Sequence, residues 1–420
     1  MENTTVIQRQ ISLSWIDKIY RRLVFSAFES IQTGHLTVIM GERAYEFGTA
    51  GSDLQCTVTI VDPAMFKLFA LGGSVGAAEA YIEGYWRCSN LTTLIEIFAQ
   101  NQSQLDAFEK KFAFITGFVN NLRHLRNKNS KQGAKKNIVA HYDLGNDLYR
   151  SFLSEEMLYS SAIYPSKTST LGQAQQHKLE TICKQLDLQP GERVIEIGTG
   201  WGAFAIFAAQ KYGCHVTTTT ISEEQFAYVS QRISELGLEN NITLLKQDYR
   251  DLQGCFDKLV SIEMIEAVGH DYLSGFFAKC NALLKEDGAM LIQAITIACQ
   301  RYEHYLKQSD FIQQYIFPGG CLVSITELNK QICANTNMVV HSVSDIGLHY
   351  ARTLNDWYSR FKHAWPTLDH SKFDQRFYRL WEFYLCYCEG AFKQRATSTV
   401  HLVARKPNYV SSQCLSALDY

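Results

Sequence analysis

A short apolar stretch that runs directly into a turn of three glycines is the feature that most constrains this chain. Residues 193–197 have the length and apolar content of a buried strand. Gly198, Gly200 and Gly202 follow at alternate positions, and glycine lets the backbone turn sharply and lie against a ligand without a Cβ clash. Residues 203–211 have the composition of a helix. This order predicts the ligand-binding unit of a parallel sheet, a pattern that dinucleotide-binding proteins also use.

More strands and helices alternate after this unit, as an α/β domain with a parallel sheet requires. We therefore predict a Rossmann-like domain, preceded by a smaller one because 420 residues are too many for one ordinary core. The predicted strands are His215–Thr220, Ile242–Leu245, Lys258–Ile262 and Ala289–Ile295, with a helix at Glu223–Leu236.

The residues at the ends of the predicted strands indicate which cofactor the domain binds. The second strand ends at Thr220 and Ile221, without the acidic residue that would hold the ribose of a nicotinamide cofactor. After the third strand, Asp248 can accept a hydrogen bond from an adenine amino group and Tyr249 can lie on the ring; a helix cap or turn is the alternative for Asp248. Glu196 begins the loop that would face a positively charged methionine moiety. These features favour S-adenosylmethionine and predict a methyltransferase.

Residues 1–109 predict a small α+β domain. Residues 35–39 and 54–61 have the pattern of strands, and residues 64–71 that of a short helix. The glycine-rich stretch 72–76 is expected to interrupt the chain there.

A basic segment spans residues 110–137 and contains no Asp or Glu, although the whole chain has a net charge of −2. Its apolar residues fall near helical spacing. It is either an amphipathic helix packed on its neighbour with a solvated linker, or a surface that docks on anionic phospholipid. Nucleic acid is not an expected partner, because no binding motif accompanies the charge. The positive residues are Lys110, Lys111, Arg123, Arg126, Lys128, Lys131, Lys135 and Lys136.

Composition limits the location and the chemistry. No run of about 18 apolar residues predicts a transmembrane helix, and residues 1–11 lack the order of a secretory signal. We therefore expect a cytoplasmic protein. The twelve cysteines are scattered, and the closest pair, Cys386 and Cys388, has the wrong spacing for a zinc or redox motif, so no metal site is expected.

An ordered set of motifs resembles those of the cyclopropane-fatty-acyl-phospholipid synthases, the family that includes the mycolic acid methyltransferases. The resemblance extends from about residue 138 to 406 and implies a class I S-adenosylmethionine-dependent methyltransferase domain at 138–410, with a tail at 411–420. Residues 71–86 resemble the smaller N-terminal domain of the long, bacterial-type members. The motifs are His141–Tyr149, Met157–Ser161, Val194–Gly202, Asp248–Asp251, Ile265–His270, Tyr315–Gly320 and His349–Leu354.

The resemblance also assigns the cofactor site. It implies that residues 141–143 fold over the cleft, and that the protein forms a homodimer and acts on unsaturated phospholipid acyl chains at the inner face of the membrane. The residues implied to line the cofactor are Tyr159, Ser160, Gly198, Gly200, Thr220, Ile221, Gln225, Asp248 and Tyr249.

The family's reaction begins when an alkene carbon attacks the sulfonium methyl and a carbocation forms. A base then removes a proton from the new methyl and the ring closes. The pocket must exclude water, and aromatic faces can stabilise the cation. Candidates crowd one C-terminal region, although helix packing explains many of them equally well: Phe361, Trp365, Phe373, Phe377, Tyr378, Trp381, Phe383 and Tyr384.

The base of the family is understood as a bound bicarbonate, held by a Cys, a Glu, a His, an Ile carbonyl and a Tyr. Two positions depart from this pattern, because Ser161 replaces the Cys and Gln293 replaces the His. Both can still donate hydrogen bonds, but glutamine cannot relay a proton as histidine can. Bicarbonate is therefore expected to bind more weakly, to bind differently or to be absent. The matching residues are Ser161, Glu266, Gln293, Ile295 and Tyr350.

These departures leave alternatives to ring formation open. The cation could resolve to a methyl-branched or unsaturated product, or the acceptor could be another small lipid or an amine. His270, one turn from Glu266, could then serve as the base, or it could only cap a helix or loop. A lipid-binding protein without turnover is a third hypothesis, which the intact glycine turn and Glu266 disfavour.

Overall fold

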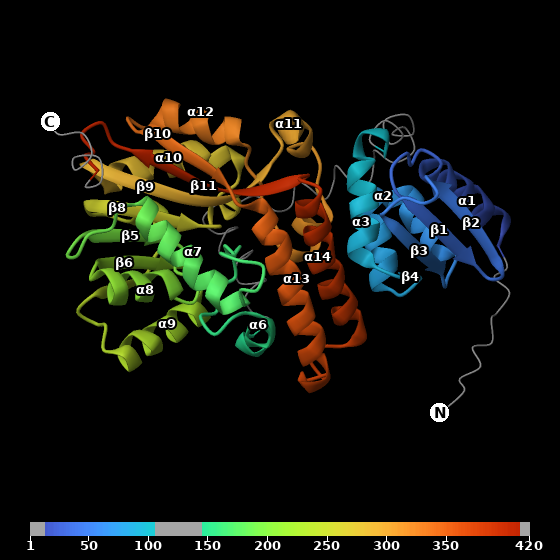
Figure 1. Ribbon diagram of the computed structural model, residues 1–420, viewed down its shortest axis with the longest axis horizontal. Coiled ribbons are helices and arrows are strands. Elements are labelled where there is room, and N and C mark those ends of the chain that lie inside the picture. The colour runs from blue at the N-terminus through green and yellow to red at the C-terminus, as the bar shows by residue number, and fades with distance from the viewer. Residues whose placement is uncertain (1–12, 106–144, 412–420) are drawn as a thin grey trace. The chain divides into compact units, whose positions relative to one another are not determined.

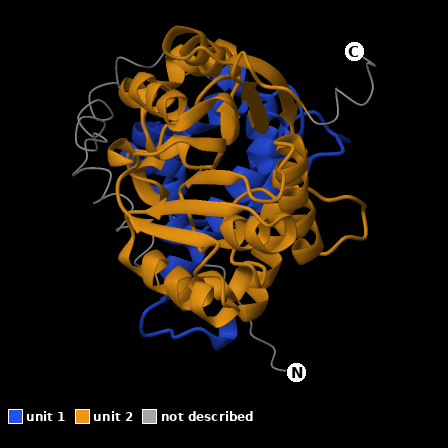
Figure 2. Cartoon of the chain, turned by 90° about the vertical axis from the view of Figure 1, so that its left-hand side faces the viewer, with its two compact units in different colours: residues 1–126, 308–312, 365–396 blue, residues 127–307, 313–364, 397–420 orange. Residues whose placement is uncertain are grey.

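The computed structural model describes residues 13–105 and 145–411 (Figure 1). The predicted basic segment at 110–137 and the cover at 141–143 lie outside the described residues. The chain divides into two compact units, shown in different colours in Figure 2.

The first unit contains residues 1–126, 308–312 and 365–396. Its four-stranded sheet has the order β2-β1-β3-β4, in which β1 and β3 are parallel and the other pairs are antiparallel. Helices α1 and α2 pack together, and α14 packs against α2 and α3. The elements are α1 (Trp15–Phe28), β1 (His35–Met40), β2 (Arg43–Gly48), β3 (Gln55–Ile60), α2 (Ala64–Ile82), β4 (Trp86–Cys88), α3 (Leu91–Gln100) and α14 (Gln375–Lys393).

The small domain agrees with the prediction at its glycine-rich stretch 72–76. Gly73, with φ 55° and ψ −137°, is not helical and separates two helical stretches within α2, since glycine tolerates a positive φ. The helix nevertheless continues beyond the predicted end at residue 71. Strands β2 and β4 were not predicted, because β2 has no buried side chain and β4 has only three residues.

Residues 365–396, which the sequence analysis placed within the methyltransferase domain, group by their contacts with the small unit. Buried polar contacts connect α14 to the N-terminal helices. The Tyr81 hydroxyl donates to Glu382 (2.6 Å), and the Thr92 hydroxyl donates to Glu389 (2.9 Å). A Cβ at Gly390 would lie 2.8 Å from the side chain of Ile95, so glycine permits the close approach of α14 and α3.

The second unit contains a seven-stranded sheet of order β10-β11-β9-β8-β5-β6-β7. Strands β5 to β9 are parallel to one another, and β11 is antiparallel to both β9 and β10. The elements are α6 (Asn146–Phe152), α7 (Leu171–Gln185), β5 (Arg193–Ile197), α8 (Ala203–Tyr212), β6 (His215–Thr220), α9 (Glu223–Leu236), β7 (Ile242–Lys246), β8 (Phe256–Ile262), α10 (Leu273–Leu283), β9 (Leu284–Ile297), α11 (Tyr302–Tyr305), α12 (Ile325–Asn335), β10 (Val339–Asp345), α13 (Gly347–Ala364) and β11 (Thr397–Arg405).

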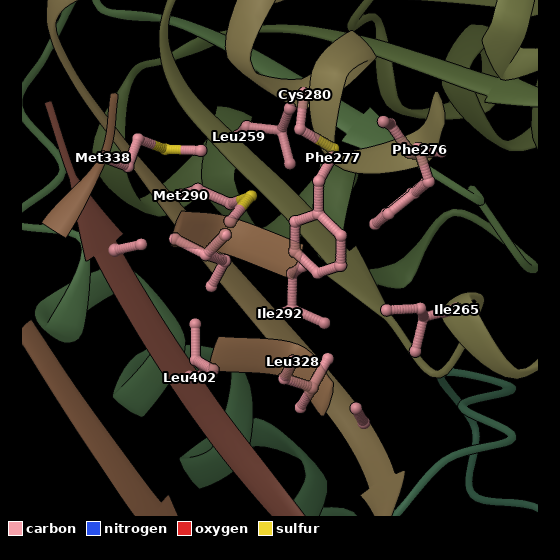
Figure 3. Packing of buried hydrophobic residues seen from close by; sticks show 14 of the residues in the cluster. Leu259, Ile265, Phe276, Phe277, Cys280, Met290, Ile292, Leu328, Met338 and Leu402 are labelled. Atoms are coloured by element: carbon pink, nitrogen blue, oxygen red, sulfur yellow. The ribbon is translucent and has the colours of Figure 1, made fainter. Parts of the chain in front are cut away.

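Helices cover both faces of this sheet, which confirms the predicted α/β class. Ile195 and Ile197 of β5 join a core with α10 and α12, part of which is shown in Figure 3. Val194 joins the opposite core, with α7, α8 and α9. The predicted parallel strands are all present. Strands β10 and β11 were not predicted.

Candidate active site

The site lies where the strand order of the large sheet reverses. Strand β5 is hydrogen-bonded to β6 on one side and β8 on the other, and ligands in open α/β sheets bind at the carboxyl ends of the strands beside such a switch point. The loops after β5 and β8 meet here, because a Cβ at Gly198 would lie 3.1 Å from the Met264 side chain. The predicted glycine turn and the acidic loop after β8 therefore share one edge of the sheet.

All three glycines of the turn adopt a positive φ, of 98° at Gly198, 52° at Gly200 and 86° at Gly202. This conformation favours glycine. A Cβ at Gly202 would also lie 3.0 Å from Val229 of α9, whereas a Cβ at Gly200 would have no neighbour within 4 Å. The turn thus packs tightly at Gly198 and Gly202 and leaves space at Gly200, as a cradle for a cofactor requires.

The ends of β6 and α9 are joined by polar contacts. The Thr220 hydroxyl donates to the side-chain oxygen of Gln225 (2.8 Å), and the Ser222 amide donates to Thr220 (3.1 Å). Ile221 lies between them and is half-buried. The residues expected to line the cofactor here are therefore held rigidly beside the glycine turn.

Asp248 caps a short helical turn after β7 and forms two further hydrogen bonds with the Arg250 guanidinium, at 2.8 and 2.7 Å. The alternative interpretation of Asp248 as a cap is thus present in the structure, and the adenine contact stays a prediction. The Tyr249 ring lies edge-on to Phe276, at 5.5 Å between centroids. Burial raises the pKa of Tyr249 to about 12.

Glu196 lies within β5 and is buried, so it does not begin the loop as the sequence analysis assumed. Its carboxyl group accepts a hydrogen bond from Thr218 (2.6 Å). Burial raises the pKa of Glu196 to about 8. The predicted approach to the methionine moiety stays untested.

Tyr159 and Ser160 join the site from the segment between α6 and α7. The Tyr159 ring lies within an aromatic cluster, with centroids 5.2 Å from Trp357 and 6.0 Å from Phe152. The Ser160 hydroxyl accepts from the buried ammonium group of Lys178 (2.6 Å). Burial lowers the pKa of Lys178 to about 8, and the negative charge of Glu263 opposes this shift.

The carboxylate of Glu263, in the loop after β8, is the centre of the polar network. It accepts from the Ser161 amide (2.9 Å), the Gln293 side-chain amide (2.7 Å) and the Tyr350 hydroxyl (2.8 Å). These three donors were expected to hold bicarbonate, whereas Glu263 was recognised only as a polar residue at the end of its strand and was given no role. The free anion does not fit this arrangement, because Glu263 already uses these donors and would repel a second negative charge.

Glu266 and Ile295 occupy the adjoining part of the network. The Ile295 amide donates to Glu266 (2.5 Å), while the second carboxyl oxygen of Glu266 is buried and has no hydrogen-bond partner. Burial, together with the negative charge of Glu263, raises the pKa of Glu266 to about 8. The structure therefore brings together all five positions implied for the anion.

Gln293 is supported from the neighbouring strand. Its side-chain oxygen lies 3.0 Å from Nε2 of His401 on β11, and Nδ1 of His401 lies 2.8 Å from the Gln185 side chain. Burial lowers the pKa of His401 to about 3, so the imidazole is neutral. A neutral imidazole has one N–H. When Nε2 donates it to the Gln293 oxygen, the Gln293 NH₂ group is directed toward Glu263, and Nδ1 accepts from Gln185 with the oxygen and nitrogen of that amide exchanged.

Two other groups of predicted residues lie elsewhere. His270 pairs with the Tyr302 hydroxyl at 2.8 Å, and its role as a base stays a prediction. The C-terminal aromatic residues pack mostly with one another in the small unit, for example Phe377 on Trp381 at 5.5 Å and Phe383 on Phe311 at 4.8 Å. The aromatic rings nearest the site network instead come from α6, α13 and the segment after α6.

Three functional candidates were given no role from the sequence: Glu263, Lys178 and His401. Only Glu263 gave a signal, since it directly follows a strand at the carboxyl edge. Lys178 lies in an ordinary helix pattern, and His401 faces Gln293 only through the pairing of β11 with β9. Within the described residues, no cluster of His, Cys, Asp and Glu could hold a metal ion.

The parallel sheet, its switch point and the glycine turn form a nucleotide-type cofactor site, and the strand end at Thr220 without an acidic residue indicates an S-adenosylmethionine-dependent methyltransferase of class I. Residues 129–402 match the family described as mycolic acid cyclopropane synthetase. The chain belongs to this family, as its resemblance to the cyclopropane synthases predicted.

Similar proteins support the assignment. The cyclopropane-fatty-acyl-phospholipid synthase of Escherichia coli (strain K12) is 36% identical over 83% of this chain and 86% of its own length. The tuberculostearic acid methyltransferase UfaA1 of Mycobacterium tuberculosis is 35% identical over 76% of each chain. The mycolic acid cyclopropane synthase CmaA1, solved with SAH and CTAB, has a TM-score of 0.61 and 30% identity, covering 65% of this chain and 98% of that one.

Proposed function

We propose that this enzyme transfers the methyl group of S-adenosylmethionine to a double-bond carbon of an unsaturated phospholipid acyl chain, and that the product closes to a cyclopropane ring. The observation that carries the proposal is a buried carboxylate network beside an aromatic cluster at the switch point of the sheet. Cyclopropane formation needs both parts: a group that takes a proton and surfaces that stabilise a cation.

The cofactor, held by the glycine turn with the ends of β6 and β7, supplies an electrophilic methyl group. The chain itself has three tasks. The rings of Tyr159 and Trp357 offer aromatic faces to a carbocation. The closely packed surroundings exclude water, which would quench that cation. A base must then accept a proton, and the carboxylates after β8 are the candidates.

A methyl-branched product is the second candidate, and the replacements at Ser161 and Gln293 favour it. UfaA1 is named a tuberculostearic acid methyltransferase, and a 31% identical protein of Emericella nidulans a sphingolipid C9-methyltransferase. In this alternative the cation loses its proton from the acyl chain instead of from the new methyl.

The lipid is proposed to be reached at the inner face of the membrane. The basic segment 110–137 supports this location by its charge, because anionic phospholipid attracts Lys and Arg. Among the described residues, no helix combines the length and the apolar character needed to cross a bilayer. A homodimer stays a prediction.

Mass spectrometry of phospholipids from a host with and without expression of this chain tests the proposal. We expect unsaturated acyl chains to gain one methylene unit, while saturated chains in the same lipids stay unchanged and serve as the internal control. Unchanged unsaturated species in cells that contain the folded protein would overturn the proposal.

A further inference from the structure

Glu263 has a backbone conformation that glutamate rarely adopts. Its φ is 49°, in the left-handed region that favours glycine. Non-glycine residues remain there only when their surroundings hold them, and such residues gather at functional sites. The loop after β8 is therefore built to place a carboxylate at a position where glycine would fit with less strain.

Three separate parts of the fold supply the hydrogen bonds to this carboxylate. The Ser161 amide comes from the segment between α6 and α7, Gln293 from β9, and the Tyr350 hydroxyl from α13. A further hydrogen bond fixes the backbone of this residue, because the Glu263 amide donates to the Gln293 carbonyl (2.8 Å). Donors spread over the fold in this way form a preorganised anion site.

We infer that the Glu263 carboxylate takes the place of the free anion and is the built-in base of this enzyme. The inference rests on the proposed function and specifies its proton-transfer step. The carbon–sulfur bond of the cofactor breaks as the methyl joins one alkene carbon, leaving a cation on the other carbon. Glu263 takes a proton from the new methyl, and the electron pair of that carbon–hydrogen bond closes the ring. The proton passes to solvent after the product leaves.

The surroundings of Glu263 suit this task. Burial raises the pKa of Glu263, which makes the carboxylate a stronger base, while the three donors and the charge of Lys178 keep the ionised form accessible. Glu266 does not compete for the proton at neutral pH, because its own raised pKa leaves it protonated.

Bicarbonate dependence tests the inference directly. In carbon dioxide-free buffer, with unsaturated phospholipid vesicles, the wild-type rate should not change when bicarbonate is added. Glu263→Gly should lose on the order of a hundredfold or more in rate, and added bicarbonate should restore part of it, because the freed donors can hold the ion. Glu263→Gln should be equally slow but should not respond, since the amide fills the site.

A second measurement does not depend on turnover. Bicarbonate should raise the melting temperature of Glu263→Gly and leave the wild type and Glu263→Gln unchanged. Glycine suits the positive φ at this position, so Glu263→Gly is expected to fold. The matched control is Glu239→Gln, at an exposed position after α9, which should behave like the wild type in both assays.

Different outcomes would contradict the built-in base and the proposed function. A wild type that methylates lipid only with bicarbonate, or a Glu263→Gly variant that is fully active without it, would overturn the built-in base. A folded wild type that methylates no unsaturated lipid, with or without bicarbonate, would instead overturn the proposed function.

Discussion

At the scale of single residues, two glutamates three positions apart have different surroundings. Burial raises the pKa of Glu263, and three hydrogen-bond donors oppose this shift by favouring the carboxylate. Glu266 has one donor, and burial together with the charge of Glu263 raises its pKa to about 8. Glu266 is thus a positioning residue that joins the loop to β9 through the Ile295 amide.

Glutamine substitutions should separate these two roles. Glu266→Gln replaces a neutral carboxyl group by a neutral amide, so we expect product formation within about tenfold of the wild-type rate. Glu263→Gln removes the base and should cost on the order of a hundredfold or more. Initial rates at saturating cofactor measure both effects. Equal losses in the two variants would contradict the assignment.

His401 should make the protein sensitive to acid. The unfolded chain binds a proton on this imidazole near pH 6.5, whereas the folded chain does so only near pH 3, because burial lowers the pKa. Between these values the unfolded state binds more protons, so the free energy of unfolding falls as the pH falls, by up to about 1.4 kcal/mol per pH unit.

Denaturant titrations at pH 7 and pH 5 measure this effect. His401→Gln cannot titrate and should lose less stability over that interval than the wild type. Equal losses in the two proteins would show that His401 does not cause the pH dependence of the free energy of unfolding.

The residues of the site were predictable to different degrees. Glycine spacing and strand ends located Gly198, Gly200 and Thr220 because those signals are local in the sequence. The role of Glu263 depends on a positive φ and on donors 102 and 87 positions away. No local pattern records those contacts.

At the scale of elements, the central parallel strands were predictable because they are short apolar runs between glycine and polar turns. Strand β11 was not predicted, although most of it is buried. The packing of helix α14 against the N-terminal helices was not predictable, because its partners Tyr81 and Thr92 lie about 300 positions earlier.

Two glycine substitutions test the packing of α14. Gly390→Val should destabilise the small unit by about 1–3 kcal/mol, because its side chain would collide with Ile95. Gly275→Ala in α10 is the control: no atom lies near its Cβ, and alanine should add about 0.5–1 kcal/mol. Calorimetry measures both changes. An unchanged transition in Gly390→Val would contradict the packing.

At the scale of the whole molecule, the basic segment gives the chain an uneven charge. The segment 110–137 has eight Lys and Arg residues and no acidic residue, within a protein of net charge −2. Lipid binding through such a segment is electrostatic and therefore weakens as salt screens the charges.

Vesicle sedimentation tests whether the segment 110–137 binds anionic phospholipid. We expect binding to anionic vesicles that falls with rising salt, and weaker binding after Lys131, Lys135 and Lys136 are changed to Gln. Equal binding to neutral vesicles, or no binding to either kind, would contradict a phospholipid-docking segment.

The fate of the transferred methyl tests the central claim most directly. Purified enzyme receives S-adenosylmethionine with a trideuterated methyl group and unsaturated phospholipid vesicles, and the product is examined by mass spectrometry and NMR. The account predicts a cyclopropane ring that keeps two of the three deuterium atoms, because the base removes the third. A methyl-branched product that keeps all three, or lipid without deuterium, would contradict it.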